Sequence, residues 1–259
     1  AWADLTGMSL NAGKIVEARN REVQYLKVKK VYDKIPRKTA LARGWKVIKT
    51  RWIGINKGDD DDPIYRSRFV GKEFNTGEME GIFAGTPPLE ALRCLIHEAA
   101  TVRGGQDVNH KVIMVNDVAR AFFEAPAVRP LCVEIPEEDK NETDRRADHV
   151  GFLRMSLYGT RDAAVNWQEE VAREMIRWGF KRGRYNPCLY WHPDTDLMTL
   201  VHGDDFVSVG GREAAKAFKA KLESRFEIKT QVIGSGQPPP VWSACAPAGR
   251  SGPQTNADW

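Results

Sequence analysis

Two short apolar runs on either side of a four-residue polar segment constrain the possible folds of this chain more than any other feature. The segment reads His202-Gly203-Asp204-Asp205, and aliphatic, mostly β-branched side chains dominate residues 198–201 and 206–209 beside it. Such runs are typical of short buried strands, and Gly203 supplies the residue that a tight turn needs where φ is positive. The sequence therefore predicts a β-hairpin with two adjacent carboxylates at its tip. An ordinary polar turn is the simpler interpretation of the same residues.

A third acid strengthens the case for metal chemistry. Adjacent carboxylates repel each other, and a divalent cation such as Mg²⁺, which prefers oxygen ligands, removes that cost. Asp117 closely follows the apolar run 112–115. By itself it is equally consistent with a helix N-cap. One acid at a strand end and two at a hairpin tip are, however, the ligand set of a two-metal phosphoryl-transfer site.

Charge and composition narrow the classes of function. The formal net charge is +4, but residues 1–75 hold 17 Lys and Arg against 9 Asp and Glu, so the rest of the chain is net acidic. This division fits a nucleic-acid path leading to a metal site, although a solvated basic surface is the simpler interpretation. No apolar run reaches membrane-spanning length, so we expect no membrane partner. The scattered cysteines indicate a reducing compartment without a zinc module.

The spacing of apolar residues predicts the secondary structure. We expect helices with one apolar stripe each over residues 13–32, 89–100, 164–178 and 212–225. We expect a strand over 45–56 that pairs with a returning strand over 64–73, and further strands near 112–115, 131–135, 152–155 and 226–232. The acidic stretch 136–148 is expected to be an exposed loop. Such an order of strands and helices is typical of an α+β fold.

The order of several motifs resembles the reverse transcriptase of copia-type long-terminal-repeat retrotransposons. The resemblance runs from about Arg51 to Gly234 and stops there. A truncation or a frameshift would produce such an ending. The matching segments are Tyr65–Lys72 (a basic fingers strand), Ile82–Ala84 with Leu89–Arg93, Asp117–Phe123 (motif A), Ser156–Gly159 with Ala163 and Trp167 (motif B), and Gly179-Phe180, Asn186–Tyr190 and Asp204-Asp205 (motif C).

This resemblance implies a polymerase right-hand fold. Its fingers and its palm would form one body, with helices backing an antiparallel palm sheet, and no thumb is recognisable. We therefore expect three segments, which are a basic N-terminal segment over residues 1–44, fingers and palm over 45–234, and a disordered tail over 235–259.

The resemblance also implies an activity and its metal ligands. It implies an RNA-directed DNA polymerase whose partners are an RNA template, a DNA primer and deoxynucleoside triphosphates. Asp117 and Asp204 would hold two Mg²⁺ ions, with Mn²⁺ as an alternative, and Asp205 would be a third catalytic acid beside them. A decayed relic that only binds nucleic acid and a metal-dependent nuclease built from the same acids remain open.

Four residues are expected to bind the incoming nucleotide. Arg66, Arg68 and Lys72 share one face of the returning strand because side chains alternate along a strand. They would grip the triphosphate or the template backbone, although an exposed edge protected by charge explains them equally well. Phe122 lies where the family places an aromatic gate against the ribose 2′-hydroxyl. Simple core packing is the alternative for Phe122, and Phe123 could fill either role.

Three residues near motif B are expected to lie at the template. Tyr158 and Gly159 form the turn of the motif, and a buried tyrosine is an equally good interpretation of the first. Asp162 stands where the family carries a glutamine that helps to seat the template. His202 and Gly203 replace an aromatic and a small apolar residue of the family.

The cellular location follows only from the resemblance and the cysteines. We expect an intracellular protein, either in a cytoplasmic particle or in the nucleus. The sequence does not predict the oligomeric state.

Overall fold

A six-stranded antiparallel sheet forms the centre of one half of the molecule, in the order β12-β5-β11-β10-β9-β8. The computed structural model describes residues 10–59, 62–74, 84–101 and 111–234. The expected tail, residues 235–259, lies outside the described residues. The strands are β5 (Lys111–Val118), β8 (Lys181–Arg182), β9 (Leu189–His192), β10 (Leu197–His202), β11 (Asp205–Gly211) and β12 (Ile228–Ile233).

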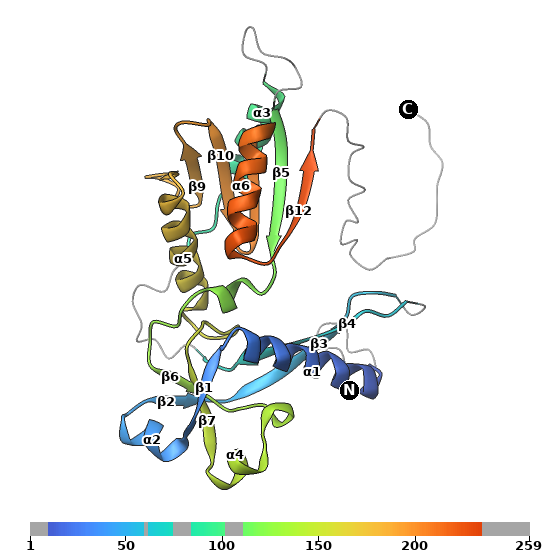
Figure 1. Ribbon diagram of the computed structural model, residues 1–259, viewed down its shortest axis with the longest axis vertical. Coiled ribbons are helices and arrows are strands. Elements are labelled where there is room, and N and C mark those ends of the chain that lie inside the picture. Colours follow the sequence, from blue (N-terminus) through green and yellow to red (C-terminus); the bar gives the residue numbers. More distant parts are fainter. Residues whose placement is uncertain (1–9, 60–61, 75–83, 102–110, 235–259) are drawn as a thin grey trace, which may run out of the picture.

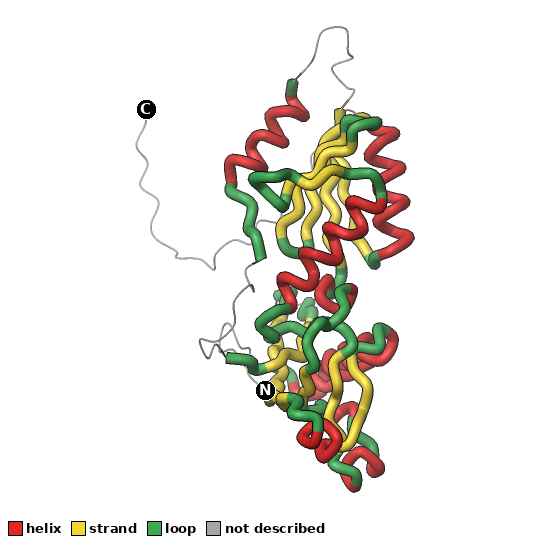
Figure 2. Tube along the Cα trace, turned by 90° about the vertical axis from the view of Figure 1, so that its left-hand side faces the viewer, coloured by secondary structure: helices red, strands yellow, loops and turns green. Residues whose placement is uncertain are grey.

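Helices cover both faces of this sheet (Figure 2). Side chains of β5 alternate, so that Val112, Met114 and Val118 enter the main core while Ile113 faces the other way. The main core includes residues of α5 (Ala163–Arg177) and α6 (Arg212–Arg225), and the opposite face is covered by α3 (Leu89–Ala100). The sheet is therefore buried on both sides, which explains the almost continuous apolar runs of its strands.

The second half of the molecule lies beyond one end of this sheet (Figure 1). It contains a four-stranded sheet in the order β1-β7-β6-β2 and a separate β3-β4 hairpin, against which the long helix α1 packs. Short helices η1, η2 and α4 connect the strands. The elements are α1 (Ala12–Val28), β1 (Tyr32–Pro36), α2 (Arg37–Ala42), β2 (Lys46–Ile48), β3 (Thr50–Asn56), β4 (Tyr65–Gly71), η1 (Ala121–Glu124), β6 (Leu131–Val133), η2 (Glu137–Asp139), α4 (Glu142–Arg146) and β7 (His149–Leu153).

Most expected elements are present, and α5 and α6 match closely. The expected helix over residues 13–32 is too long, because Lys30 takes a left-handed φ of 50° and the chain then enters β1, which pairs with β7. The expected single strand over 45–56 is also wrong. It is divided into β2, which runs parallel to β6, and β3, which pairs with β4. The pairing of β3 with β4 is the predicted one, whereas the prediction missed the pairing of β2 with β6, because β6 is distant in sequence.

The spacing predicts an apolar stripe of Leu89, Leu92, Ile96, Ala99 and Ala100 on α3, and the structure confirms it only in part, since Leu92 and Ala99 pack against the sheet. Leu89 is 56% exposed and Ile96 is 47% exposed, whereas Ala91 and Leu95 are buried against the sheet. No helix in the described part of the chain is long and apolar enough to cross a membrane.

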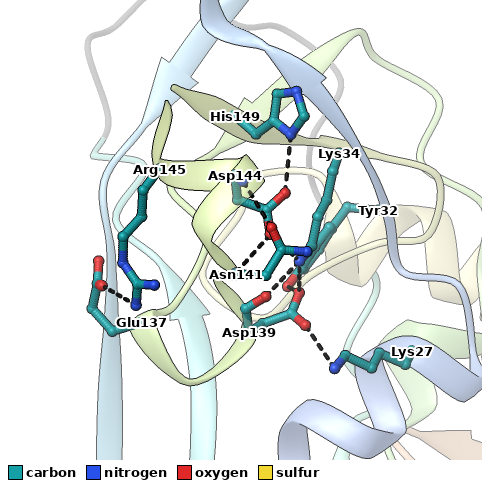
Figure 3. Close-up of polar contacts among 9 residues, drawn as sticks. All are labelled: Lys27, Tyr32, Lys34, Glu137, Asp139, Asn141, Asp144, Arg145 and His149. Atoms are coloured by element: carbon teal, nitrogen blue, oxygen red, sulfur yellow. Dashed lines mark hydrogen bonds and ion pairs between the residues drawn. The ribbon is translucent and has the colours of Figure 1, made fainter. Parts of the chain in front are cut away.

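The acidic stretch 136–148 is not an exposed loop, contrary to expectation (Figure 3). Asp139 is buried and pairs with Lys27 at 2.9 Å, and it also accepts a hydrogen bond from Tyr32. Asp144 is buried between Lys34 Nζ at 2.8 Å and His149 Nδ1 at 3.0 Å. A buried carboxylate needs such partners, which α1 and β1 supply from distant parts of the sequence and β7 supplies from five residues away.

Candidate functional site

The three predicted acids meet at the end of the six-stranded sheet that faces the other half of the molecule (Figure 1). Asp117 near the end of β5 is the direct register partner of Asp205 at the start of β11. Asp204 lies in the turn beside them, where its carbonyl oxygen accepts a hydrogen bond from Val118 N at 2.9 Å. The predicted hairpin is confirmed, since His202 pairs with Asp205.

The charges of these acids act on one another. Partial burial raises the pKa of Asp205, and the negative charges of Asp204 and Asp117 raise it further. A cation near the three carboxylates would relieve this repulsion, and oxygen ligands suit Mg²⁺. Among the described residues, however, no three His, Cys, Asp or Glu side chains are grouped so that they could hold a metal ion. The donor chemistry fits Mg²⁺, and these side chains would need to rotate toward a common point.

The two phenylalanines after Asp117 have different surroundings. Phe123 is fully buried in the core of the second half of the molecule. Phe122 is partly buried, and its ring centroid lies 4.6 Å from that of Tyr158. It also lines a cavity of about 210 Å³ whose wall includes Gly203 of the acid hairpin. Of the two rings, Phe122 is therefore the one beside open space at the site.

Backbone contacts hold the turn of motif B on the end of β4. Gly71 N donates to the carbonyl oxygen of Tyr158 at 2.7 Å, and Glu73 N donates to that of Gly159 at 3.3 Å. Gly159 has a φ of 79°, and a Cβ added there would lie 2.1 Å from the carbonyl oxygen of Gly71. Only glycine fits this contact. The contact brings the Tyr158 ring under Arg68, whose guanidinium carbon is 4.9 Å from the ring centroid.

The predicted nucleotide-binding cations line one cavity with this turn. Arg66, Arg68 and Lys72 line a space of about 580 Å³ together with Tyr158 and Gly159. Burial lowers the pKa of Arg66, and the charge of Arg68 lowers it further, which shows that positive charge is concentrated here. Arg68 Nε is buried and has no hydrogen-bond partner within the described residues. The cavity is thus suited to an anion.

Tyr158 connects this cationic cavity to the acids. Burial raises the pKa of Tyr158 to about 12; the positive charge of Arg68 opposes the shift and the negative charge of Asp204 adds to it. Its side chain is therefore close enough to both groups to interact with their charges. The partly buried ring lines the cavity and also packs against the core cluster that contains Phe123.

Asp162 has a structural partner that the sequence did not indicate. It is buried and accepts a hydrogen bond from Arg129 at 2.7 Å, and Asn166 also contacts it. Arg129 makes two further hydrogen bonds, of 3.1 and 2.9 Å, to the carboxylate of Glu73. These contacts bind the start of α5 to the end of β4. Arg129 therefore compensates the buried negative charge of Asp162.

Three further contacts at the site were missed from the sequence. Arg120, with a left-handed φ of 51°, donates to Glu22 on α1 at 2.8 Å, and its guanidinium carbon lies 3.4 Å from the centroid of the Tyr25 ring. Trp167 Nε1 donates to the carbonyl oxygen of Gly203 at 2.7 Å, so α5 supports the acid hairpin. Glu22 lies on the same side of α1 as Ile15, Ala18 and Leu26, and this charge among apolar residues was a signal in the sequence of a buried partner.

Comparison with known proteins adds independent information. The family model for reverse transcriptase (RNA-dependent DNA polymerase) matches residues 32–234. A retrovirus-related Pol polyprotein from transposon TNT 1-94 of Nicotiana tabacum is 23% identical over 224 residues, which cover 83% of this chain and 16% of the polyprotein. A solved structure of apo telomerase from Candida tropicalis, truncated from its C-terminal domain, aligns with a TM-score of 0.47 and 9% identity over 92% of this chain and 59% of that one. The first two matches confirm the resemblance seen in the order of the motifs.

Proposed function

Because the chain belongs to the reverse transcriptase (RNA-dependent DNA polymerase) family, we propose that it is the polymerase domain of a retrotransposon polyprotein. It would add deoxynucleotides to the 3′-hydroxyl of a DNA primer that is paired with an RNA template. The observation that carries this proposal is the direct register pairing of Asp117 with Asp205, with Asp204 in the adjacent turn. In this assignment the six-stranded sheet is the palm and the β3-β4 hairpin belongs to the fingers.

Asp117 and Asp204 are the proposed metal ligands, with Asp205 as a third acid next to them. When bound, two Mg²⁺ ions, or Mn²⁺ ions, would supply activation of the primer hydroxyl and neutralisation of the leaving pyrophosphate. Burial raises the pKa of Asp205, and repulsion from Asp204 and Asp117 raises it further. This repulsion supports the proposed role, because a cation bound between the carboxylates would relieve it.

The cationic cavity is the proposed triphosphate site. Its arginines present planar donors, and Arg68 Nε has no hydrogen-bond partner within the described chain. A triphosphate would neutralise the positive charge of Arg66 and Arg68, which is crowded enough to lower the pKa of Arg66 together with burial. Tyr158 lines this cavity and its ring centroid lies 4.6 Å from that of Phe122, so a nucleotide whose phosphates enter the cavity would place its sugar near Phe122. Tyr158 and Gly159 are proposed to contact the template on the same side, and Asp162 is proposed to act there only through Arg129.

Primer extension on an RNA template with Mg²⁺ tests the proposal. Asp117→Asn and Asp204→Asn keep the side-chain shape but remove a charge, so we expect each to lower the extension rate by about 10²–10³. Asp194→Asn is the matched control, since this exposed acid lies in the turn at the other end of β10. Extension by the acid variants at the parental rate would refute the assignment. Cleavage of the template without extension would indicate a nuclease, and binding alone would indicate a relic.

A further inference from the structure

A column of stacked side chains lies on the half of the molecule away from the acids. Trp45 and Phe152 stack with their ring centroids 4.4 Å apart and their planes at 23°. Arg43 lies over the Trp45 ring at 4.8 Å, and Arg154 lies over the Phe152 ring at 5.1 Å. We call these four residues the Trp45–Phe152 column. They line a cavity of about 380 Å³ together with Asp33, Ile35 and Thr39.

The column forms because one face of the four-stranded sheet is only partly covered. Leu153 on β7 enters the core, whereas Val150 and Phe152 belong to the cluster on the opposite face. The helix over that face, α2, is six residues long, and its Ala40 packs in the same cluster as Val150. Phe152 is left half-buried beyond the end of this short helix.

The end of α2 determines the position of Trp45. Gly44 has a φ of 68°, and Trp45 N donates to the carbonyl oxygen of Ala40 at 2.9 Å while Gly44 N donates to that of Leu41 at 3.0 Å. These two bonds form a Schellman motif, which turns the chain back over the helix end. The indole ring therefore returns onto the sheet and stacks on Phe152.

The arginines of the column can reach an anion in solution. Arg43 and Arg154 are both exposed. Arg154 pairs with Asp33 at 2.6 Å, but both side chains are at least half exposed, so water and salt weaken this pair and a phosphate could replace the carboxylate. The Arg154–Asp33 pair is weak, and the Trp45 and Phe152 rings are only partly buried. These contacts therefore contribute little to the stability of the fold.

We propose that the Trp45–Phe152 column binds single-stranded nucleic acid. Arg43 and Arg154 would pair with backbone phosphates, and bases would stack on the rings or on the guanidinium planes, as in other single-strand binders. The two arginines of the column favour a polyanion as the ligand. The two aromatic rings beside them favour a polyanion that carries bases, which is a nucleic acid. The choice of a polynucleotide rests on the proposed function, but the binding surface does not involve the acids.

The proposed binding at the Trp45–Phe152 column can be tested with the full chain and a fluorescein-labelled single-stranded RNA. Fluorescence anisotropy at several salt concentrations gives the affinity. For the double variant Arg43→Gln, Arg154→Gln we expect affinity to fall at least fivefold. The slope of log K against log salt should fall by about 0.7 for each phosphate that the variant no longer neutralises. The matched control is Arg146→Gln, because Arg146 is an exposed arginine on α4 of the same half. Unchanged affinity and slope in the double variant would overturn the proposal.

Photocrosslinking locates the strand independently of stability. With an RNA that carries 4-thiouridine, we expect crosslinked peptides that contain Trp45 or Phe152. Phe152→Leu keeps an apolar side chain but removes the stack, and should lower this crosslink with little change in the circular dichroism spectrum. Crosslinks confined to the cavity of Arg66, Arg68 and Tyr158 would overturn the column and still support the proposed function. Crosslinks at the column without any primer extension would support the column and refute the polymerase.

Discussion

Glu22 accepts a hydrogen bond from Arg120 Nε at 2.8 Å, although 98 positions separate the two residues in sequence. Glu22 is 2% exposed, and Arg120 stands three residues after Asp117 in a left-handed conformation. The pair therefore links helix α1 to the loop that follows Asp117, one of the predicted metal ligands. If Arg120 is removed, water cannot reach the buried Glu22 carboxylate to solvate its charge. The stability of the fold should therefore depend strongly on this pair.

Removal of the cation from this pair should therefore destabilise the fold. We expect Arg120→Met to lower the free energy of unfolding by about 3 kcal/mol, because it leaves the Glu22 charge buried without its cation. Urea unfolding followed by circular dichroism measures the change. The control Glu17→Gln alters an exposed acid on the same helix and should change stability by less than about 0.5 kcal/mol. A parental midpoint for Arg120→Met would show that the pair is not important for stability.

Two glycines with positive φ should respond differently to alanine. Gly159→Ala places a Cβ 2.1 Å from the carbonyl oxygen of Gly71, whereas Gly203→Ala meets nothing within 4 Å. Gly203→Ala should cost only the left-handed backbone strain of about 1 kcal/mol. Gly159→Ala should cost about 3 kcal/mol or more, because the motif B turn must also leave β4. Thermal unfolding of both variants compares them, and equal losses would contradict the close approach to Gly71.

The acid hairpin and α5 were predictable because their signals are local. Gly203 lies between two apolar runs, and the stripe of α5 recurs at helical spacing over fifteen residues. The three acids came together for the same reason, since each stands at the end of an apolar run that is typical of a strand. Spacing could not show whether their side chains converge on an ion, which depends on rotamers.

The contacts that the sequence did not reveal all join distant segments. The end of α1 depends on the pairing of β1 with β7, and the burial of Asp162 depends on Arg129, which is 33 residues away. The division of residues 45–56 between two sheets likewise requires β6 as a partner. Local patterns show which residues carry charge or apolar surface. They do not show which partners a compact fold will bring to them.

The buried cluster around Asp144 should make stability depend on pH. Burial by itself would raise the pKa of this carboxyl, but hydrogen bonds from the Asn141 amide, Lys34 and His149 hold it well below its ordinary value of 3.8. Because the pKa is lower in the folded state, the contribution of Asp144 is complete above about pH 5. It is lost as the pH falls below 3.8 and through the folded-state pKa.

Asp144→Asn measures this contribution. We expect a loss of about 2 kcal/mol at pH 7, since charge-assisted hydrogen bonds are removed, and a smaller difference from the parent at about pH 2.5. Urea unfolding at both pH values gives the two differences. Glu142→Gln, an exposed acid on the same short helix, serves as the control and should show no such change. A loss that stays constant with pH would show that Asp144 acts through packing and not through its charge.

The last prediction separates the two phenylalanines that follow Asp117. Phe122 borders the cavity beside Gly203, whereas Phe123 is fully buried. If the proposed polymerase is active, Phe122→Val should raise the incorporation of ribonucleotides relative to deoxyribonucleotides, because a smaller side chain no longer clashes with a 2′-hydroxyl. Phe123→Val should leave this ratio near the parental value and instead lower stability by about 1–3 kcal/mol, since it opens a cavity in the core. Single-nucleotide extension with each triphosphate, together with thermal unfolding, gives both quantities. A higher ribonucleotide ratio in Phe123→Val than in Phe122→Val would show that Phe123 is the gate, and an unchanged ratio in both would make Phe122 a packing residue.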